Sequence, residues 1–413
     1  MKPKRKVAVI GGGAAGFFAA IRLAELNPDA EVHIFEKSPQ FLAKVRVSGG
    51  GRCNVTHSCF EPGSLITNYP RGGKQLLSGF HRYAPQDTIQ WFGERGVKLK
   101  TEEDGRMFPV SDSSQTVIDL FMSEAGRLGV KLNTNTGLTG LRAYKGGWAL
   151  SFTGNRTEEF PLVLIATGSA PSVWRMLEAE GVKIIPPVPS LFTFNIKNRK
   201  MSELMGISIM DTEVRIPELR LKSRGPLLFT HWGLSGPAIL KLSAFGAIGL
   251  HERNYSFNIT VNFLPEHTEE EVMESLKEEK IRSPKKQTGT FAPFSEVPKR
   301  CWHFLLTDSG IDLQSNWADV SNKALRQITD RLRNFSVMVE GKSTFKDEFV
   351  TCGGISLDEV DLRTYEAKRF SGLFFAGEAL NVDGITGGFN FQHAWTSGWL
   401  AAQGMTEKMS KLP

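Results

Sequence analysis

Residues 7–16 read Val7-Ala8-Val9-Ile10-Gly11-Gly12-Gly13-Ala14-Ala15-Gly16, and this stretch decides the fold. The apolar residues predict a short buried strand, the glycines a tight turn, and the residues from Ala14 onward a helix. Gly11 permits the turn, Gly13 lets the backbone approach a pyrophosphate, and Gly16 allows the helix to pack on the strand. The stretch therefore predicts a phosphate cradle for a dinucleotide, with unpaired N–H groups at the helix N-terminus.

A second apolar run ends at an acidic residue at the distance that a dinucleotide-binding fold needs. Residues 31–36 end on Glu36, twenty positions after Gly16, and a carboxylate there binds ribose hydroxyls. The alternative interpretation is a secretory signal, because basic residues precede the apolar stretch. Adjacent glycines interrupt that stretch, and Arg22 and Glu25 follow at helical spacing, so we expect the chain to start in its own fold.

Length and composition limit the class of protein. With 413 residues, of which 40% are hydrophobic, the chain is long enough for two or three domains. The most apolar segment, 227–250, contains His231 and Lys241, so we expect a soluble protein without a membrane span. The four cysteines form no C-x-x-C pair, which predicts no metal site and favours a reducing cytoplasm over a disulfide framework.

The charge of the chain is mildly basic, with a net charge of +6 and a pI near 9.0. This bias is compatible with a polyanionic partner such as RNA. The alternative is that the basic residues form solvated faces that balance an acidic helix around residues 269–274. The locally basic segments contain Arg215, Arg220, Lys222 and Arg224, and, further on, Arg282, Lys285, Lys286, Lys299 and Arg300.

The pattern along the chain predicts an α/β dinucleotide-binding domain that an insertion interrupts. Apolar runs that are typical of buried parallel strands occur in the first part of the chain and again at 372–378. Between them, short alternating segments predict a small antiparallel barrel or sandwich, and helices at 265–280 and 324–334, separated by a loop at 282–298, predict a helical subdomain. The predicted domains are a Rossmann-like domain (1–189 and 351–413), a β-barrel (190–264 and 335–350) and the helical subdomain (265–334).

Two further strand ends favour FAD over a nicotinamide dinucleotide. Ala166-Thr167-Gly168 follows a buried strand, and Phe375-Ala376-Gly377-Glu378 ends a strand near the carboxyl end. This order is similar to that of the two-dinucleotide-binding-domain flavoproteins. That resemblance implies that the N-terminal cradle binds the ADP half of FAD and that the last strand binds its ribityl chain.

The segment 384–392, Gly-Ile-Thr-Gly-Gly-Phe-Asn-Phe-Gln, predicts a contact with the flavin ring. Negative charge accumulates at flavin N1 and the adjacent carbonyl on reduction, and a helix N-terminus aimed there stabilises it. Gly387 and Gly388 let the backbone approach the ring, and Asn390 or Gln392 is expected to hydrogen-bond its edge. The alternative is an ordinary glycine turn before a helix that runs to about residue 403.

The most distinctive stretch is 44–56, Lys-Val-Arg-Val-Ser-Gly-Gly-Gly-Arg-Cys-Asn-Val-Thr, which favours a loop wrapped over a ring and phosphates rather than a helix or strand. With Gly-Arg-Met-Phe-Pro at 105–109, Thr-His-Trp-Gly-Leu-Ser-Gly-Pro at 230–237 and the C-terminal Gly-Gly-x-Asn-x-Gln, it resembles the BaiN/RdsA-type (YhiN-like) family of bacterial NAD(P)/FAD-dependent oxidoreductases. The likeness spans essentially the whole chain. The chain departs from the family at Asn381, where Asp is common, and at His393, where a small residue is common, while Asp383 remains.

The resemblance implies an FAD-dependent reduction of a carbon–carbon double bond conjugated to a carbonyl, with hydride from flavin N5 and a proton from a side chain. Uridine of ribosomal RNA and a steroid-type enone both stay open as substrates, and the basic segments favour RNA. The sequence contains one complete phosphate cradle, so NAD(P)H as electron donor has no Rossmann domain of its own. Other readings are a flavin-bearing RNA- or ribosome-binding protein without turnover, and an oxidase or dehydrogenase of a small metabolite.

Cys53 is the first choice for the proton donor and His231 the second. In the alternative, Cys53 is a packing residue and His231 caps a helix. Arg52 and Arg106 either hold the substrate or a phosphate, or pair with acids. The predicted cofactor-binding residues lie in the glycine-rich segments and at the strand ends: Gly11, Gly13, Ala14, Ala15, Gly16, Glu36, Lys37, Lys44, Ser48, Gly49, Gly50, Arg52, Asn54, Thr56, Ala166, Thr167, Gly168, Gly377, Glu378, Asp383, Gly387, Gly388, Asn390 and Gln392.

Overall fold

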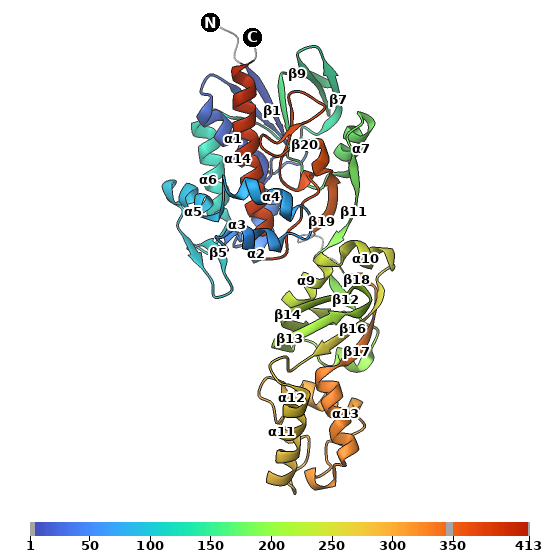
Figure 1. The fold of residues 1–413 in the computed structure, drawn as a ribbon. Coiled ribbons are helices and arrows are strands. Elements are labelled where there is room, and N and C mark those ends of the chain that lie inside the picture. Colours follow the sequence, from blue (N-terminus) through green and yellow to red (C-terminus); the bar gives the residue numbers. More distant parts are fainter. Residues whose placement is uncertain (1–4, 344–349, 412–413) are drawn as a thin grey trace. The chain divides into compact units, whose positions relative to one another are not determined.

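The computed structural model describes residues 5–343 and 350–411 (Figure 1). The chain forms two compact units, one made of Met1–Val188 with Val350–Pro413 and the other of Pro189–Phe349. The predicted fold class, an α/β domain interrupted by an insertion, is confirmed, since the first unit contains chain from both sides of the second. Small parts of the predicted domains, at 1–4, 344–349 and 412–413, lie outside the described residues.

A mainly parallel sheet forms the core of the first unit, as its apolar runs predict. The strand order is β20-β21-β22-β10-β1-β2-β6, and the strands from β22 to β6 are parallel. Residues 7–10 are buried because β1 pairs on both sides, with β2 and β10. The strands are β1 (Lys6–Ile10), β2 (Glu31–Phe35), β6 (Lys131–Asn133), β10 (Leu162–Ile165), β20 (Val360–Asp361), β21 (Glu366–Ala367) and β22 (Leu373–Phe375).

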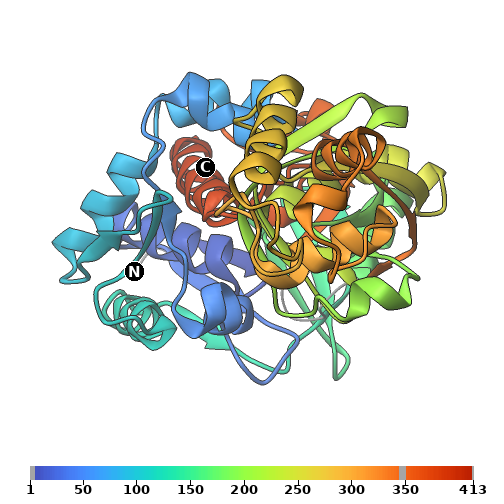
Figure 2. The same ribbon diagram turned by 90° about the horizontal axis from the view of Figure 1, so that it is seen from below.

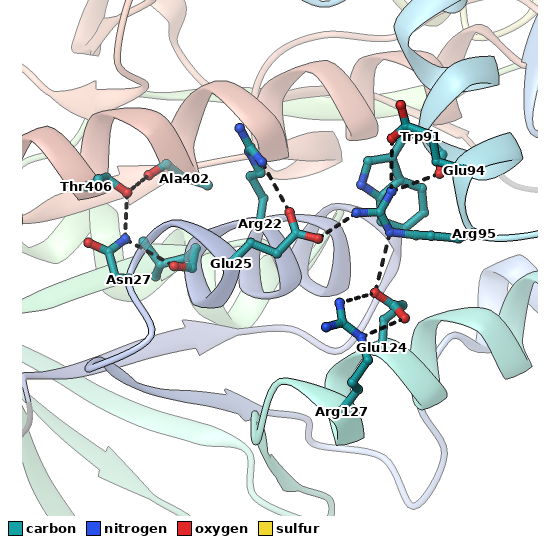
Figure 3. A network of polar contacts seen from close by, with 11 residues as sticks. Arg22, Glu25, Asn27, Trp91, Glu94, Arg95, Glu124, Arg127, Ala402 and Thr406 are labelled. Carbon is teal, nitrogen blue, oxygen red and sulfur yellow. Dashed lines mark hydrogen bonds and ion pairs between the residues drawn. The ribbon is translucent and has the colours of Figure 1, made fainter.

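Two helices that are far apart in the sequence, α1 (Ala14–Leu26) and α14 (Phe389–Ser410), pack against each other in this unit (Figures 1 and 2). Small residues allow the close approach, because a Cβ on Gly398 would lie 2.8 Å from the Ala15 carbonyl oxygen. At the end of α1, the Asn27 side chain donates a hydrogen bond to Thr406 Oγ1 (2.8 Å; Figure 3). α1 begins at Ala14 as predicted, whereas α14 continues beyond residue 403 because its buried face continues.

Arg95 joins α1 to α6 (Ser114–Arg127) through a polar network (Figure 3). Arg95 directly follows α5 (Pro85–Glu94). Its Nη2 donates to Glu25 Oε1 (2.6 Å), and its Nε lies 3.5 Å from Glu124 Oε2. Its guanidinium also lies 4.2 Å from the centre of the Trp91 ring. The charged side chains of Arg95, Glu25 and Glu124 are 18%, 15% and 13% exposed, so the network is largely shielded from water.

We expect Arg95→Met to lower the free energy of unfolding by about 2–3 kcal/mol, because two shielded carboxylates lose a shared cation. Arg127→Ala is the matched control. Arg127 also binds Glu124, at 2.7 Å, but its side chain is 58% exposed, and exposed pairs contribute about 0–1 kcal/mol. Urea unfolding measures both variants, and equal losses would contradict the structural role of Arg95.

The remaining elements of the first unit include three small sheets, β3-β5-β4, β7-β8-β9 and β11-β19. β7, β8 and β9 are consecutive antiparallel strands joined by short turns. The strands are β3 (Thr56–His57), β4 (Leu99–Thr101), β5 (Arg106–Pro109), β7 (Leu138–Tyr144), β8 (Gly147–Phe152), β9 (Arg156–Phe160), β11 (Ile184–Ser190) and β19 (Val350–Ile355). The further helices are α2 (Ala43–Gly51), α3 (Pro62–Leu65), α4 (Gly73–Phe80) and α7 (Pro171–Ala179).

The second unit contains an antiparallel sheet that closes into a barrel, with the strand order β17-β16-β13-β14-β15-β12-β18. Its outer strands, β17 (Phe335–Glu340) and β18 (Lys342–Ser343), are consecutive in the chain and flank Gly341. Gly341 has φ +114°, and one bent strand therefore pairs with both ends of the sheet. The other elements are β12 (Thr193–Asn195), β13 (Ser208–Ile216), β14 (Leu221–Phe229), β15 (Gly233–Ser235), β16 (Ser256–Asn262), α8 (Arg199–Ser202), α9 (Pro237–Phe245) and α10 (Ala247–Glu252).

A group of three helices, α11 (Glu269–Arg282), α12 (Lys299–Asp308) and α13 (Asn322–Arg333), belongs to the same unit. The sequence pattern predicts α11 and α13 but not α12. α12 begins after Pro298, and its Trp302 is fully buried and donates to the Thr288 carbonyl (2.9 Å). In the part of the chain that the structure describes, no helix is long and apolar enough to span a membrane.

Candidate dinucleotide-binding site

The phosphate cradle has the form that the glycine spacing predicts. Gly11 has φ +112°, and a Cβ there would lie 2.3 Å from the Ala166 carbonyl oxygen. A Cβ on Gly16 would lie 2.0 Å from the Gly11 carbonyl oxygen, so both glycines are required by the fold. In contrast, apart from its neighbours along the chain, no atom of the described residues lies within 4 Å of the Cβ position of Gly13, which precedes α1 without a side-chain cap. The N–H groups of α1 therefore face an open surface that suits a phosphate.

Glu36 lies directly after β2, beside this cradle. Its Oε2 accepts from the Gly12 N–H (2.8 Å), and its Oε1 accepts from the Ser38 N–H and hydroxyl (both 2.9 Å). A cavity of about 90 Å³ adjoins it at the carboxyl ends of β1, β2 and β10, with Lys37 and Thr167 in its lining. Because a carboxylate oxygen accepts more than one hydrogen bond, Glu36 keeps the capacity to bind a ribose hydroxyl there.

The carboxyl ends of β10 and β22 bring two further predicted segments to the same edge of the sheet. Residues 166–168 follow β10, and residues 377–378 follow β22. A Cβ on Gly168, which has φ +62°, would lie 3.6 Å from Glu378 Oε2. The same oxygen forms an ion pair with Lys44 Nζ (2.6 Å). The fold thus brings together predicted residues from three segments of the sequence.

The glycine segment that follows Lys44 is a broken helix. α2 begins at Ala43, but Ser48 is extended (ψ 147°), and Gly49 and Gly50 are left-handed (φ +58° and +68°). The expectation of a loop is therefore wrong for residues 44–47, which contain no helix breaker, and for Thr56, which begins β3, and it holds from Ser48 to Val55. No atom lies within 4 Å of the Cβ positions of Gly50 and Gly51, so the tip of this segment is open to a ligand.

Arg52 and Arg106 both contact the Phe108 ring and the Glu102 carboxylate. The guanidinium of Arg52 lies 4.0 Å from the centre of the Phe108 ring, and that of Arg106 lies 5.5 Å from it. Arg52 Nη1 donates to Glu102 Oε1 (2.6 Å), and Arg106 Nη2 lies 3.1 Å from Glu102 Oε2. The hydrogen bond to Glu102 raises the pKa of Arg52. The sequence left two interpretations of these arginines: binding of a substrate or phosphate, or pairing with an acid. In the structure, both arginines pair with an acid.

The Gln392 side chain has partners inside the protein. Its side chain is fully buried, and its Oε1 accepts hydrogen bonds from the hydroxyls of Thr56 (2.6 Å) and Thr88 (3.0 Å). Its Nε2 donates to Thr396 Oγ1 (3.1 Å). Both ends of the amide are engaged, so Gln392 and Thr56 join α14 to β3 and α5, and a contact of Gln392 with the flavin ring stays a prediction.

Asn390 and Asn54 hold the N-terminus of α14. Asn390 exchanges two hydrogen bonds with the backbone of Gly384, at 2.8 and 3.0 Å. With its amide nitrogen directed to the Thr56 carbonyl, Asn54 accepts from the Gly388 N–H (2.9 Å). A Cβ on Gly388 would lie 2.5 Å from the same Thr56 carbonyl oxygen. These amides therefore fix the backbone at the start of the helix.

Asp383 has a protein partner that the sequence pattern does not reveal. The residue is fully buried, and Arg71 donates through Nε to Asp383 Oδ1 (2.6 Å) and through Nη2 to Oδ2. The Arg71 side chain is 12% exposed. The carboxylate that we expected to bind the cofactor is therefore part of a shielded ion pair, which fixes the segment before α14.

The two predicted proton donors have different surroundings. Cys53 is fully buried with φ +62°, and burial raises the pKa of its thiol to about 12. A general acid works best when its pKa is near the operating pH, so these surroundings favour the packing role of Cys53.

His231 belongs to the second unit, where it is exposed and packs edge-on against Trp232 (5.1 Å between ring centres). α9 has no side-chain cap at Gly236, so His231 does not cap it. Both donor roles stay predictions.

Two histidines, His57 and His393, lie near the C-terminal glycines. His57 stacks on Phe389, the first residue of α14 (4.7 Å between ring centres), and its Cδ2 lies 3.4 Å from the Cβ position of Gly387. Within the described residues, its buried Nδ1 has no hydrogen-bond partner, whereas the His393 ring lies against the Gly377 backbone. Buried polar atoms without partners are rare. Together with the open surfaces at Gly13 and Gly50, this atom fits a site that holds a dinucleotide.

The sequence signals for these two histidines were weak or absent. His57 carries no motif of its own, and His393 was noted only as a departure from the family pattern. Their surroundings depend on contacts between segments that are more than 300 residues apart.

Comparison with known proteins finds relatives of this chain. The family described as "HI0933-like protein Rossmann domain" matches residues 5–404. A Haemophilus influenzae protein named "Ribosomal RNA dihydrouridine synthase" is 29% identical over 411 residues, which cover 95% of this chain and 96% of that protein. A Clostridium scindens protein named "3-dehydro-bile acid delta(4,6)-reductase" is 26% identical, with 98% and 99% covered. The open conformation of a flavocytochrome c3 fumarate reductase has a similar fold, with a TM-score of 0.52 at 14% identity over 98% of this chain and 79% of that chain.

Proposed function

The chain belongs to the HI0933-like family of Rossmann-domain proteins, and we propose that it is an FAD-dependent oxidoreductase that reduces a carbon–carbon double bond conjugated to a carbonyl. One observation carries this proposal. Two relatives that match nearly the whole chain are named for the formation of dihydrouridine and for the reduction of a 3-dehydro-bile acid. Both names describe hydrogen addition to a double bond near a carbonyl, so one reaction type serves both substrates.

The residues at the sheet edge suit the parts of FAD. The open face of Gly13 and the N–H groups of α1 would hold the pyrophosphate, and Glu36 would hold the adenosine ribose. Gly387 and Gly388 would admit the flavin ring at the N-terminus of α14, whose dipole favours negative charge there. When bound, FAD would supply the hydride for the reduction.

Uridine in ribosomal RNA is the substrate that we propose first, because the relative with 29% identity is named for that product. The charge of the barrel adds little support. Arg224 binds Asp211 (2.7 Å) and Glu266, and Arg215 binds Glu213 (2.7 Å), so much of the basic segment is neutralised by ion pairs. A 3-oxo steroid with a conjugated double bond is the second candidate, favoured by the bile acid reductase among the relatives.

The test uses purified protein that is loaded with FAD and reduced without oxygen. Reoxidation is followed by flavin absorbance after addition of ribosomal RNA from cells that lack the protein, of a conjugated 3-oxo steroid, or of buffer. We expect the RNA to reoxidise the flavin and to gain dihydrouridine, with binding that weakens as salt rises. Reoxidation by the steroid alone would establish the second candidate. RNA binding without reoxidation by either acceptor would overturn the proposed reaction in favour of a flavin-bearing RNA-binding protein.

We also propose NAD(P)H as the electron source and the cytoplasm as the compartment. The sequence contains one complete phosphate cradle, so the nicotinamide cofactor has to react at the flavin without a Rossmann domain of its own. Anaerobic mixing of the FAD-loaded protein with NADH or NADPH tests the electron source, and failure of both to bleach the flavin would show that another donor is used.

We expect Cys53→Ala to leave turnover within about threefold, because loss of a proton donor lowers turnover about 10²- to 10⁴-fold and the thiol is sealed from the solvent. The free energy of unfolding should fall by about 1–2 kcal/mol, because a packed side chain is truncated. Steady-state rates and urea unfolding measure the two effects. Cys53→Ser, which keeps the size of the side chain, is the control. A hundredfold loss of turnover at normal FAD content would restore Cys53 as the proton donor.

A further inference from the structure

The group of three helices in the second unit has one end next to the barrel and one end away from it (Figure 1). The segment before α11 and the end of α13 adjoin the barrel strands, and there the Phe263 N–H donates to the Leu332 carbonyl (2.8 Å). At the other end, the segment after α11 lies against the segment before α13, because the Trp317 N–H donates to the Lys286 carbonyl (3.0 Å). We call this end, residues 277–288 and 315–327, the distal end.

Charge is divided unevenly between the two ends of the helical group. The distal end contains seven basic and three acidic residues, whereas the rest of the group, residues 265–276, 289–314 and 328–334, contains four basic and nine acidic residues. Part of this acidic charge is used next to the barrel, where Glu266 binds Arg224 of β14. The helical group therefore carries net positive charge only at its distal end.

Most cations of the distal end are exposed and have no acidic partner. Five exposed basic side chains form no ion pair in the part of the chain that the structure describes: Lys277, Lys285, Lys286, Lys323 and Arg326. Arg282 differs, because it binds the buried Glu279. The barrel differs too, since Arg215 (2.5 Å) and Lys222 (3.8 Å) both pair with Glu213. The five side chains at the distal end remain available to an external anion.

The composition of this surface suits a phosphate backbone better than a protein or a lipid. Among the large apolar side chains of the distal end, all of which the structure describes, Ile281 alone is exposed, to 80%. A protein interface has an apolar centre, and a helix that lies on a membrane has an apolar face. Four of the five unpaired cations are lysines, whose flexible side chains bind phosphates as point charges.

We infer that the distal end binds the phosphate backbone of the RNA substrate. This inference rests on the proposed function with ribosomal RNA as substrate. Contacts to phosphates supply affinity and orientation without reading the base sequence, so these side chains hold the RNA while other residues select the uridine. The helical group is then an RNA-binding arm of the second unit.

The test compares RNA binding by the parent protein, by Lys285→Gln with Lys286→Gln, and by the control Arg215→Gln with Lys222→Gln. Each double variant loses two positive charges, but only the control pair shares an acidic partner in the parent. Fluorescence anisotropy follows labelled fragments of ribosomal RNA at several salt concentrations. We expect the dissociation constant of the distal variant to rise about tenfold at low salt and its logarithmic salt dependence to fall by about two, one for each lost phosphate contact. The control should stay within about twofold of the parent.

Two further measurements separate binding from folding and from chemistry. Urea unfolding and FAD titration should give the parent's values in the distal variant, because Lys285 and Lys286 are exposed and lie in the second unit. In turnover with ribosomal RNA, the distal variant should show a raised KM at an unchanged kcat. Adding Lys323→Gln should weaken RNA binding further.

Equal RNA affinity and equal salt dependence in the parent and the distal variant would overturn the inference, while RNA-dependent reoxidation of the flavin would still support the proposed function. Weakened RNA binding in the distal variant, in a parent that reoxidises with no acceptor, would support the inference and overturn the proposed reaction. Binding to vesicles of phosphatidylserine and phosphatidylcholine in preference to RNA, with loss of that binding in Ile281→Ser, would overturn the inference in favour of a membrane surface.

Discussion

The variant Gly13→Ala is expected to fold as stably as the parent protein and to bind FAD at least about 100-fold more weakly. No atom lies within 4 Å of the added Cβ, and the φ of −94° and ψ of −168° suit alanine, so the cofactor-free protein accommodates the methyl group. A pyrophosphate placed against the N–H groups of α1 would meet that methyl group. Fluorescence titration with FAD and urea unfolding of the cofactor-free protein measure the two effects separately.

Gly16→Ala is the matched control, since it makes the same chemical change three residues along. Here the added Cβ would lie 2.0 Å from the Gly11 carbonyl oxygen, a backbone atom at the turn. We expect a loss of about 3 kcal/mol or more in the free energy of unfolding. Normal FAD affinity in Gly13→Ala would contradict the assignment of this cradle to a dinucleotide.

Arg71→Ala is expected to lower the free energy of unfolding by about 3–5 kcal/mol. The change leaves the fully buried carboxylate of Asp383 without the guanidinium that binds it through two nitrogens, and removal of one partner from a shielded pair is strongly destabilising. Urea unfolding of cofactor-free protein measures the loss without any contribution from FAD binding.

The double variant Arg71→Met with Asp383→Leu is the control for this effect. Replacing both charges with apolar side chains should recover most of the lost stability, because no buried charge is left uncompensated. If Arg71→Ala costs less than about 1 kcal/mol, the pair does not hold the segment before α14. If Asp383→Asn folds normally but no longer binds FAD, the cofactor role that the sequence suggested for Asp383 is restored.

The elements that carry strong local signals were predicted well. Gly13 marks the start of α1 and Asn27-Pro28 its end, so its bounds follow from residues at its two ends. β22 was found because an apolar run ends in a glycine and an acid. α12 was missed because its N-cap, Pro298, has no side chain that can cap, and its first turn opens with the basic residues Lys299 and Arg300 instead of acidic ones.

Side-chain roles were harder to predict than elements. The periodicity of α14 does not tell whether Gln392 faces a ligand or the interior, because the answer depends on Thr56 and Thr88, which lie about 300 residues earlier. The ion pair of Arg71 with Asp383 spans 312 residues and has no local signature. Glycine spacing therefore identified the site, while the partners of its polar side chains depend on long-range packing.

The position of β22 beside β10 has a consequence for the order in which the protein folds. During synthesis, every described strand of the second unit is made before β20, β21, β22 and α14, so the central sheet of the first unit still lacks three strands when the second unit has been made. The two halves of the proposed FAD site, at residues 11–36 and 377–388, meet only after that final stretch has been made. FAD therefore stabilises the chain only at the last stage of its assembly, and until then the nascent first unit has to persist without its cofactor.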